Sequence, residues 1–230
     1  MSGRSPRWFN GIQYPYEKNF ADNTWEQIIA VCQKKIVPPT WKVGDQKAMT
    51  IGGTDYLIDI IGINNDTYTA GGTAPLTFQL HDCYADKKAM NISDTNSGGW
   101  TSCAMRSTHL PAILALMPAE VKNGIREVNK LTSAGNKSST INTTSDKLFL
   151  LSEIEIFGIG RNSMSGEGTQ YDYYKAGNSK VKKLNGSAVI WWNRSPRASS
   201  STAFCLVGSS GGEGTIGASY DRGVAFAFCF

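Results

Sequence analysis

The alternating pattern of residues 189–228 constrains the fold of this chain more than any other feature of its sequence. Three short apolar segments, 189–192, 203–207 and 224–228, are separated by stretches rich in serine and glycine. Each apolar segment has the length of one strand, while the polar stretches are better suited to the surface than to a core. The pattern predicts a β-meander whose strands pack together and whose long loops are displayed to solvent.

The rest of the chain combines helical and extended patterns. Helices are predicted where apolar residues recur at helical spacing or follow a capping residue: 24–32, 108–117, 119–130 and a turn at 152–158. Strands are predicted at the β-branched run 56–63, at 75–80, whose alternation suggests a half-buried strand, and at 148–151. Gly52-Gly53 suits a hairpin turn, and the Ser/Thr/Asn-rich segment 132–145 is expected to be an exposed loop.

These patterns predict one α+β domain spanning residues 1–230. No internal repeat and no linker divides the chain. Residues 1–23 are interpreted as an N-terminal extension, and residues 187–230 as the region that binds a ligand.

Charge and composition exclude several partners and locations. The net charge is only +4 and the basic residues are scattered, so nucleic acid is not expected as a partner. No apolar run approaches the ~20 residues of a membrane helix, which argues against membrane insertion. Residues 1–8 contain no apolar segment typical of a Sec signal peptide. The five cysteines form no CxxC pair, so buried free thiols are expected.

Two glycine-rich motifs invite a catalytic interpretation that their context does not support. Gly208-Ser209-Ser210-Gly211-Gly212 matches a nucleophile elbow, but no histidine and no helical pattern follow it. The segment 212–217 matches a dinucleotide-binding pattern without the helix that such a motif opens. His81, next to Asp82 and Cys83, lacks a second ligand cluster, so a hydrogen-bonded structural histidine is favoured over a metal ligand. We therefore expect no enzyme activity, no cofactor and no metal.

Several motifs recur in a characteristic order along the chain. They are Trp41-x-Val43-Gly44-Asp45, Ile60-Ile61-Gly62, Gly98-Gly99-Trp100, the run 148–158, Glu167-Gly168-x-Gln170-Tyr171, Trp191-Trp192-x-Arg194-Ser195-Pro196, Phe204-x-x-Val207 and Gly223-Val224. Together they resemble a domain family of Firmicutes and their phages. The C-terminal part is similar to the variable proteins of diversity-generating retroelements, which have a C-type-lectin fold related to formylglycine-generating enzymes.

This resemblance implies a C-type-lectin-like domain with short helices, small antiparallel sheets and long irregular loops. It implies a receptor-binding protein of a phage tail, or a bacterial cell-surface adhesin, whose partner is a protein or glycan receptor; a homo-oligomer is compatible with it. The candidate ligand-binding residues lie in the C-terminal region: Trp192, Asn193, Arg197, Ser199, Ser201, Thr202, Ser209, Ser210, Thr215, Ser219, Tyr220 and Asp221.

Three alternatives accompany this hypothesis. The loops could be ordinary polar loops of a domain that is not diversified, since Glu213 cannot arise from an asparagine codon by adenine changes alone. The chain could be a structural component of a virion or cell surface. It could also be a formylglycine-generating-type enzyme, although that chemistry needs a closely spaced cysteine pair and Cys205 and Cys229 are far apart in sequence. The end of the chain also departs from the family, whose members finish Gly-Val-Arg-Pro-Ala-Phe.

The aromatic residues of the C-terminal half receive structural roles in this interpretation. Consecutive residues of a strand point to opposite faces, so one of Trp191 and Trp192 is expected in the core and the other nearer the surface. Trp191 and Arg194 are assigned to the scaffold. At least two of the tyrosines in the segment 171–174 are expected in the core.

Overall fold

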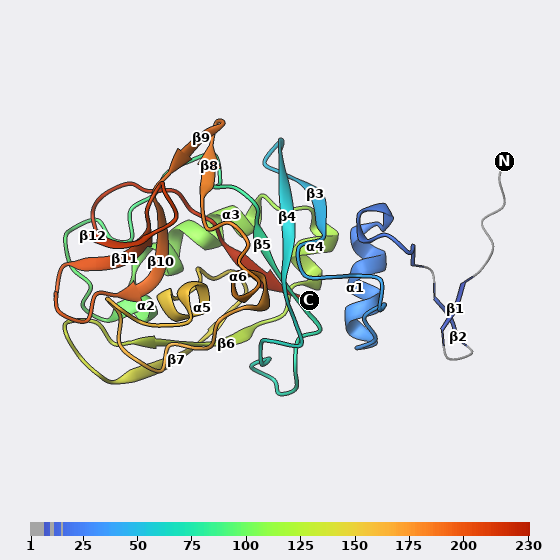
Figure 1. Cartoon of the computed structure of the whole chain (residues 1–230), viewed down its shortest axis with the longest axis horizontal. Helices are drawn as coiled ribbons and strands as arrows, with labels where there is room; N and C mark the ends of the chain where they lie inside the picture. The colour runs from blue at the N-terminus through green and yellow to red at the C-terminus, as the bar shows by residue number, and fades with distance from the viewer. Residues whose placement is uncertain (1–6, 10–11, 15) are drawn as a thin grey trace.

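The computed structural model describes residues 7–9, 12–14 and 16–230, which form short helices and small antiparallel sheets (Figure 1). The helices are η1 (Phe20–Asp22), α1 (Trp25–Gln33), α2 (Gly99–Ser102), η2 (Met105–His109), α3 (Leu110–Ala115), α4 (Ala119–Gly124), α5 (Glu153–Phe157) and α6 (Asp172–Lys175). The strands are β1 (Arg7–Phe9), β2 (Ile12–Tyr14), β3 (Gln46–Ile51), β4 (Thr54–Ile63), β5 (Leu76–Leu80), β6 (Val128–Ser133), β7 (Ile141–Asp146), β8 (Lys182–Leu184), β9 (Ser187–Val189), β10 (Trp191–Pro196), β11 (Ala203–Val207), β12 (Glu213–Gly217) and β13 (Ala227–Cys229). The predicted α+β class is confirmed.

A four-stranded sheet has the order β13-β5-β4-β3, so the end of the described chain forms one edge of this sheet, next to β5. Gly52 and Gly53 join β3 to β4 with φ values of +57° and +83°, as a tight hairpin turn requires. All five residues of β5 are buried, so the prediction of a half-buried strand was wrong. The strand lies between β4 and β13, and side chains on both of its faces are covered.

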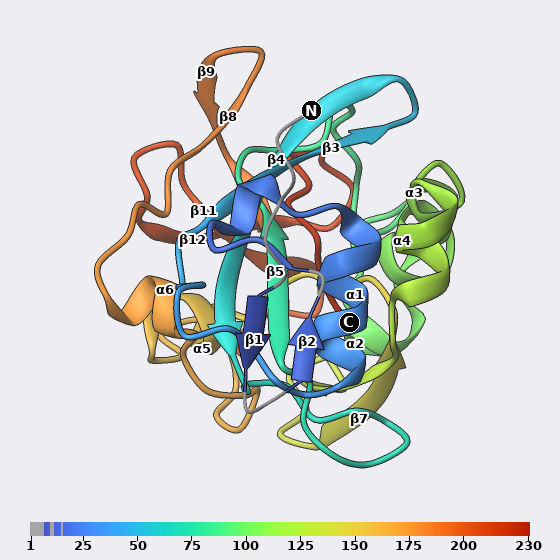
Figure 2. The ribbon, with the colours of Figure 1, turned by 90° about the vertical axis from the view of Figure 1, so that its right-hand side faces the viewer.

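An aromatic cluster joins α1 to this sheet. The ring of Phe78 on β5 lies 5.9 Å from Trp25, 5.2 Å from Phe228 and 5.4 Å from Phe230, measured between centroids. Thr24 caps α1 with a reciprocal capping box to Gln27, which confirms the predicted first helix. Figure 2 shows α1 in front of the sheet, beside the C-terminus. Burial of these large rings is the main hydrophobic contribution at this end of the molecule.

The predicted N-terminal extension, residues 1–23, lies partly outside the described residues, as does most of segment 1–8. Within its described part, Phe20 packs into the domain. Its side chain is buried, and its ring lies edge-on to Trp41 with the ring centroids 5.2 Å apart. None of the helices in the described part of the chain is long and apolar enough to cross a membrane.

Three predictions in the middle of the chain were wrong. The predicted strand 148–151 is not a strand, and Phe149 forms only an isolated bridge with Ala227. The predicted helix 119–130 stops at Gly124 in α4, because Ile125 adopts an extended conformation and the chain enters β6. Both ends of the predicted exposed loop 132–145 are strands: the end of β6 and most of β7, which pair in register from Val128↔Asp146 to Ser133↔Ile141, so only 134–140 is a loop. Cross-strand hydrogen bonds and burial of Thr132 and Thr144 outweigh the polar composition of this segment.

A buried ionic cluster joins β6, α5 and β10. The guanidinium of Arg194 donates to both carboxylate oxygens of Glu155, to the hydroxyl of Thr132 and to three backbone carbonyls. The ammonium of Lys130 lies 2.8 Å from Glu155 and 2.7 Å from Asp66. Since every charge in this cluster has an opposite partner, it fixes the position of β10. The scaffold role predicted for Arg194 is confirmed.

Tryptophan packing differs from the prediction of one buried and one surface side chain. Both Trp191 and Trp192 are fully buried. Their indole nitrogens donate to different loops, Trp191 to the carbonyl of Lys180 at 2.9 Å and Trp192 to that of Lys88 at 2.8 Å. Covering segments therefore lie on both sides of β10. The predicted burial of the tyrosines is confirmed for Tyr171, Tyr173 and Tyr174, and that of the five thiols also.

Candidate functional site

The loops that connect the last four strands carry most of the predicted ligand-binding residues. Strands β10, β11 and β12 form an antiparallel sheet at the left of Figure 1. The connections are 197–202 between β10 and β11, 208–212 between β11 and β12, and 218–226 between β12 and β13. We call the exposed residues of these three connections the C-terminal loop surface.

Strands β10 and β11 differ in exposure from the polar residues of the loops. All residues of β11 are buried, from Ala203 to Val207. Thr215, on β12 opposite Cys205, and Ser201 are half-buried. The other candidates in the loops are exposed: Arg197, Ser199, Thr202, Ser209, Ser210, Ser219, Tyr220 and Asp221. Strands β10 and β11 thus form a buried frame, while β12 and the exposed loop residues beside them face solvent at least in part.

Two predicted site residues do not belong to this surface. Trp192 and Asn193 were expected among the ligand-binding residues, but both are completely buried. They lie on β10, which is covered on both sides, so a partner at the surface cannot reach them. The sequence alone does not indicate this burial, because a Trp-Asn pair next to polar loops is compatible with a buried or an exposed position.

Sequence analysis missed a segment that adjoins the C-terminal loop surface. Residues 88–97 are hydrogen-bonded to it at several points along their length. Lys88 and Arg222 exchange two backbone hydrogen bonds of 3.0 and 3.1 Å, and the amide of Asn91 donates to Ala218 at 3.0 Å. The carboxylate of Asp94 accepts from the backbone and the hydroxyl of Ser219 at 2.9 and 2.7 Å. We call residues 88–97 the rim segment.

Asn96 anchors the far end of the rim segment. Its side-chain amide donates to the carbonyls of Ser200 and Ala203 at 2.8 and 2.7 Å, and its backbone amide donates to Ser201. Its side-chain oxygen accepts from the amide of Asn136. Asn96 is fully buried, so this single side chain fixes three loops relative to one another.

The rim segment also presents the most exposed apolar side chain among the described large hydrophobic residues. Ile92 is 96% exposed and lies between Asn91 and Asp94, which are tied to Ala218 and Ser219. Tyr220 follows directly and is 50% exposed, with the guanidinium of Arg222 5.4 Å from its ring centroid. The rim segment thus contributes an exposed isoleucine, and the last loop, which is hydrogen-bonded to it, contributes a tyrosine and an arginine. In the sequence, the one hint of this segment was an isolated apolar residue, Ile92, next to the polar Asn91.

The two glycine-rich motifs lie in a turn and a strand, and His81 lies apart from them. Ser209 and Ser210 lie in the exposed turn before β12, and the glycine-rich segment 212–217 is largely that strand rather than a helix start. His81 lies elsewhere, with Nδ1 2.9 Å from Asp59, which confirms a hydrogen-bonded structural histidine. The hydrogen bond to Asp59 raises the pKa of His81.

Burial governs the chemistry of the cysteines. It raises the pKa of Cys205 and Cys229 well above the usual value, and all five thiols are buried. A protonated, inaccessible thiol is a poor nucleophile. Within residues 16–230, no group of three or more His, Cys, Asp or Glu side chains is placed to hold a metal ion.

Sequence comparison places this chain in a family. Comparison with curated proteins and with solved structures found no match. Residues 76–230 match a family described as a domain of unknown function, DUF6273. The matched region contains the rim segment, Lys130, Glu155 and Arg194 of the buried ionic cluster, and the whole C-terminal loop surface. Because it covers more than half of the sequence, the chain belongs to the DUF6273 family.

Proposed function

We propose that this chain is a ligand-binding protein that recognises a protein or glycan receptor through its C-terminal loop surface and rim segment. The observation that carries the proposal is the separation of roles along 191–222. Residues of β10 and β11 are buried and hydrogen-bonded, whereas β12 is half-buried to exposed and most polar residues of the loops are exposed. Such a frame can present different side chains without changing its own packing, because exposed substitutions usually change stability by less than ~0.5 kcal/mol.

Rigidity of the loops supports recognition. The carboxylate of Asp94 accepts hydrogen bonds from Ser219, and the side-chain amide of Asn96 donates to the carbonyls of Ser200 and Ala203. These bonds hold the loops to the rim segment. Loops that are ordered before binding lose less conformational entropy when a partner docks. The side chains at their junction, Ile92, Tyr220 and Arg222, include the tyrosine and arginine types enriched at binding hot spots.

The wider biological setting is part of the same proposal. The motif resemblance favours a C-type-lectin-like scaffold at a phage tail tip or on a bacterial cell surface. Exposure of Arg197, Ser199, Ser219, Tyr220 and Asp221 is compatible with a region that tolerates diversification. A structural virion or surface component that contacts only its neighbours is the second candidate, since the same exposed face could be covered by assembly.

A loop exchange tests the proposal. The variant replaces exposed and half-buried polar residues of the loops and of β12 together: Arg197, Ser199, Ser201, Ser209, Thr215, Ser219, Tyr220 and Asp221. Labelled protein is applied to a panel of Firmicutes cells and binding is measured by flow cytometry. We expect wild-type binding to one or more strains, and its loss or redirection in the variant, while the melting temperature changes by less than about 5 °C.

A matched control replaces Thr143 and Lys175, which are exposed elsewhere, and should bind like the wild type. Tyr220→Ala and Arg197→Ala should account for most of the loss, since they remove the largest side chains of the set. Retention of binding by the loop-exchange variant would place recognition elsewhere. A wild-type protein that binds no cell but assembles with virion proteins would favour the structural alternative.

A further inference from the structure

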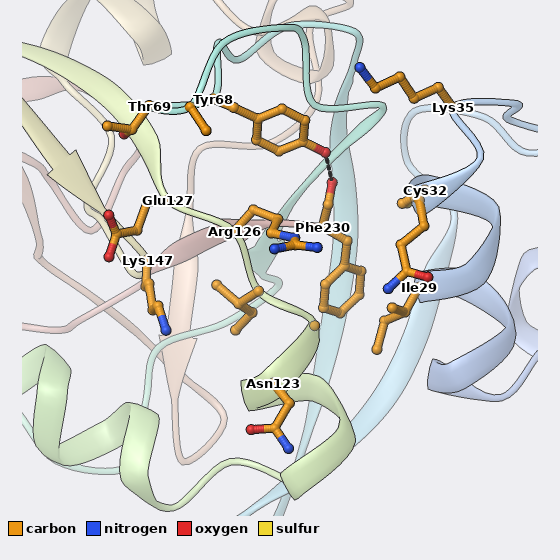
Figure 3. Close-up of a pocket in the computed structure, with 14 residues that line it drawn as sticks. Ile29, Cys32, Lys35, Tyr68, Thr69, Asn123, Arg126, Glu127, Lys147 and Phe230 are labelled. Carbon is orange, nitrogen blue, oxygen red and sulfur yellow. Dashed lines mark hydrogen bonds between the residues drawn. The ribbon is translucent and has the colours of Figure 1, made fainter.

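A cavity on the opposite end of the molecule from β10–β12 has no role in the proposed recognition. It has a volume of about 910 Å³ and lies between α1, the turn at 68–70, the end of α4 and the last residue, Phe230 (Figure 3). Volumes of this order are typical of sites for small organic molecules.

The floor of the cavity is apolar and built by the core. Ile29, Ile125 and Phe230 are exposed by 8%, 3% and 3%, respectively. At one side the hydroxyl of Tyr68 donates to the carbonyl of Phe230 at 2.5 Å, as the dashed line in Figure 3 shows. Burial raises the pKa of Tyr68 to about 12, so this hydroxyl keeps its proton and its hydrogen bond at neutral pH. An apolar ligand group on this floor would be shielded from water.

Three basic side chains line the same cavity. Arg126 lies near the centre of Figure 3, close to Phe230, with Lys35 and Lys147 towards opposite edges of the view. Within the described part of the chain, none of the three side chains forms a hydrogen bond or an ion pair. The buried basic residues Lys130 and Arg194, by contrast, are paired with carboxylates.

One side-chain carboxylate lines the cavity and offsets only part of this positive charge. Glu127 accepts a hydrogen bond of 2.7 Å from the hydroxyl of Ser145, to one side of the cavity. The lining side chains therefore carry three positive charges and one negative charge. Anions bound by arginine in a partly buried site gain from charge-assisted hydrogen bonds, which are the strongest that side chains form.

We propose that this cavity binds a small organic anion. Its acidic group faces Arg126, flanked by Lys35 and Lys147, and its apolar body lies on the floor formed by Ile29, Ile125 and Phe230. This site is separate from the C-terminal loop surface, so ligands could occupy both at once.

Fluorescence titration with anilinonaphthalene sulfonate tests the proposal, because this probe combines an anionic group with an aromatic body and brightens in apolar surroundings. We expect saturable binding to the full chain, and Arg126→Gln to raise the Kd at least about fivefold. Arg126→Lys keeps the charge and should retain most of the affinity. Lys35→Gln and Lys147→Gln should cause smaller increases, and the exposed control Lys175→Gln should cause none.

Two further arms identify the ligand chemistry. Neutral phenylnaphthylamine should bind more weakly to the wild type and should not distinguish it from Arg126→Gln. Displacement of the probe by octanoate indicates an aliphatic body, and displacement by naphthoate an aromatic one. Thermal unfolding of each variant checks that it is folded; should Arg126→Gln fail to fold, Lys35→Gln combined with Lys147→Gln replaces it. Absence of wild-type binding, or equal affinity of the wild type and the folded charge-removal variant, would overturn the proposal.

Discussion

Replacing Glu155 by glutamine tests how strongly the buried ionic cluster holds the scaffold of the C-terminal loops. The carboxylate of Glu155 accepts from the guanidinium of Arg194, lies 2.8 Å from Lys130 and accepts from the backbone amide of Ser152 at 2.9 Å. Burial raises the pKa of Glu155, but Arg194 and Lys130 outweigh it and hold that pKa below its usual value. Glutamine has the same size and can still cap α5, so the change removes mainly the charge.

The magnitude follows from what Glu155→Gln leaves unpaired. Removing one partner of a buried ion pair costs about 3–5 kcal/mol, because the remaining charge stays buried. Lys130 keeps Asp66 at 2.7 Å, whereas Arg194 keeps only neutral acceptors. We therefore expect a loss near the lower end, about 3–4 kcal/mol. In a domain of this size 1 kcal/mol shifts the melting temperature by about 2–4 °C, so the expected decrease is about 6–16 °C.

Thermal unfolding followed by circular dichroism at neutral pH measures this decrease. The control is Glu213→Gln, which breaks the exposed ion pair of 3.0 Å with Arg161; exposed pairs contribute about 0–1 kcal/mol. Because the folded pKa of Glu155 is depressed, its contribution is present above its usual value and is lost as the pH falls through the folded pKa. The difference between wild type and Glu155→Gln should therefore shrink in acid. A decrease no larger than that of the control would refute the assignment of this cluster as the lock on β10.

Four further outcomes are expected. Burial raises the pKa of Glu167 from 4.5 to about 7, so the folded chain keeps a proton that the unfolded chain loses. The free energy of unfolding should therefore fall by up to about 3 kcal/mol as the pH rises through that interval. Denaturant titrations of Glu167→Gln should show a flatter dependence on pH. Gly135→Ala should be far more destabilising than Gly177→Ala in the same assay. Both glycines have a positive φ, but a methyl group added at Gly135 would lie 1.7 Å from the carbonyl oxygen of Asn96, whereas one added at Gly177 would meet nothing within 4 Å. Phe204→Ala, at a fully buried site, should cost about 3–5 kcal/mol by equilibrium unfolding, and a cost below about 1 kcal/mol would contradict its place in the core. Because the five cysteines are buried thiols, a reductant should shift the melting temperature by less than about 5 °C.

Local features of the fold could be predicted from the sequence because neighbouring residues alone stabilise them. The capping box of Thr24 and Gln27 starts α1, and Ser152 and Glu155 repeat the same arrangement at α5. Two glycines in left-handed conformations close the β3–β4 hairpin. In each case the deciding contacts lie within a few residues of one another. The apolar segments after residue 189 likewise marked β10 and β11, whereas β12 lies in a stretch predicted to be a loop and β13 pairs with β5 in another sheet.

Tertiary structure decided the features whose partners are distant in sequence. Segment 132–145 has the composition of a loop, but the pairing of β6 with β7 makes both of its ends strands. Trp192 and Asn193 are buried because other segments cover both sides of β10, and the rim segment belongs to the candidate site because Asp94 and Asn96 bond to residues more than a hundred positions away. Composition and periodicity depend only on residues that are close together in the sequence. Burial and site membership depend instead on which distant segments pack against it, and the free energy of that packing exceeds local preference.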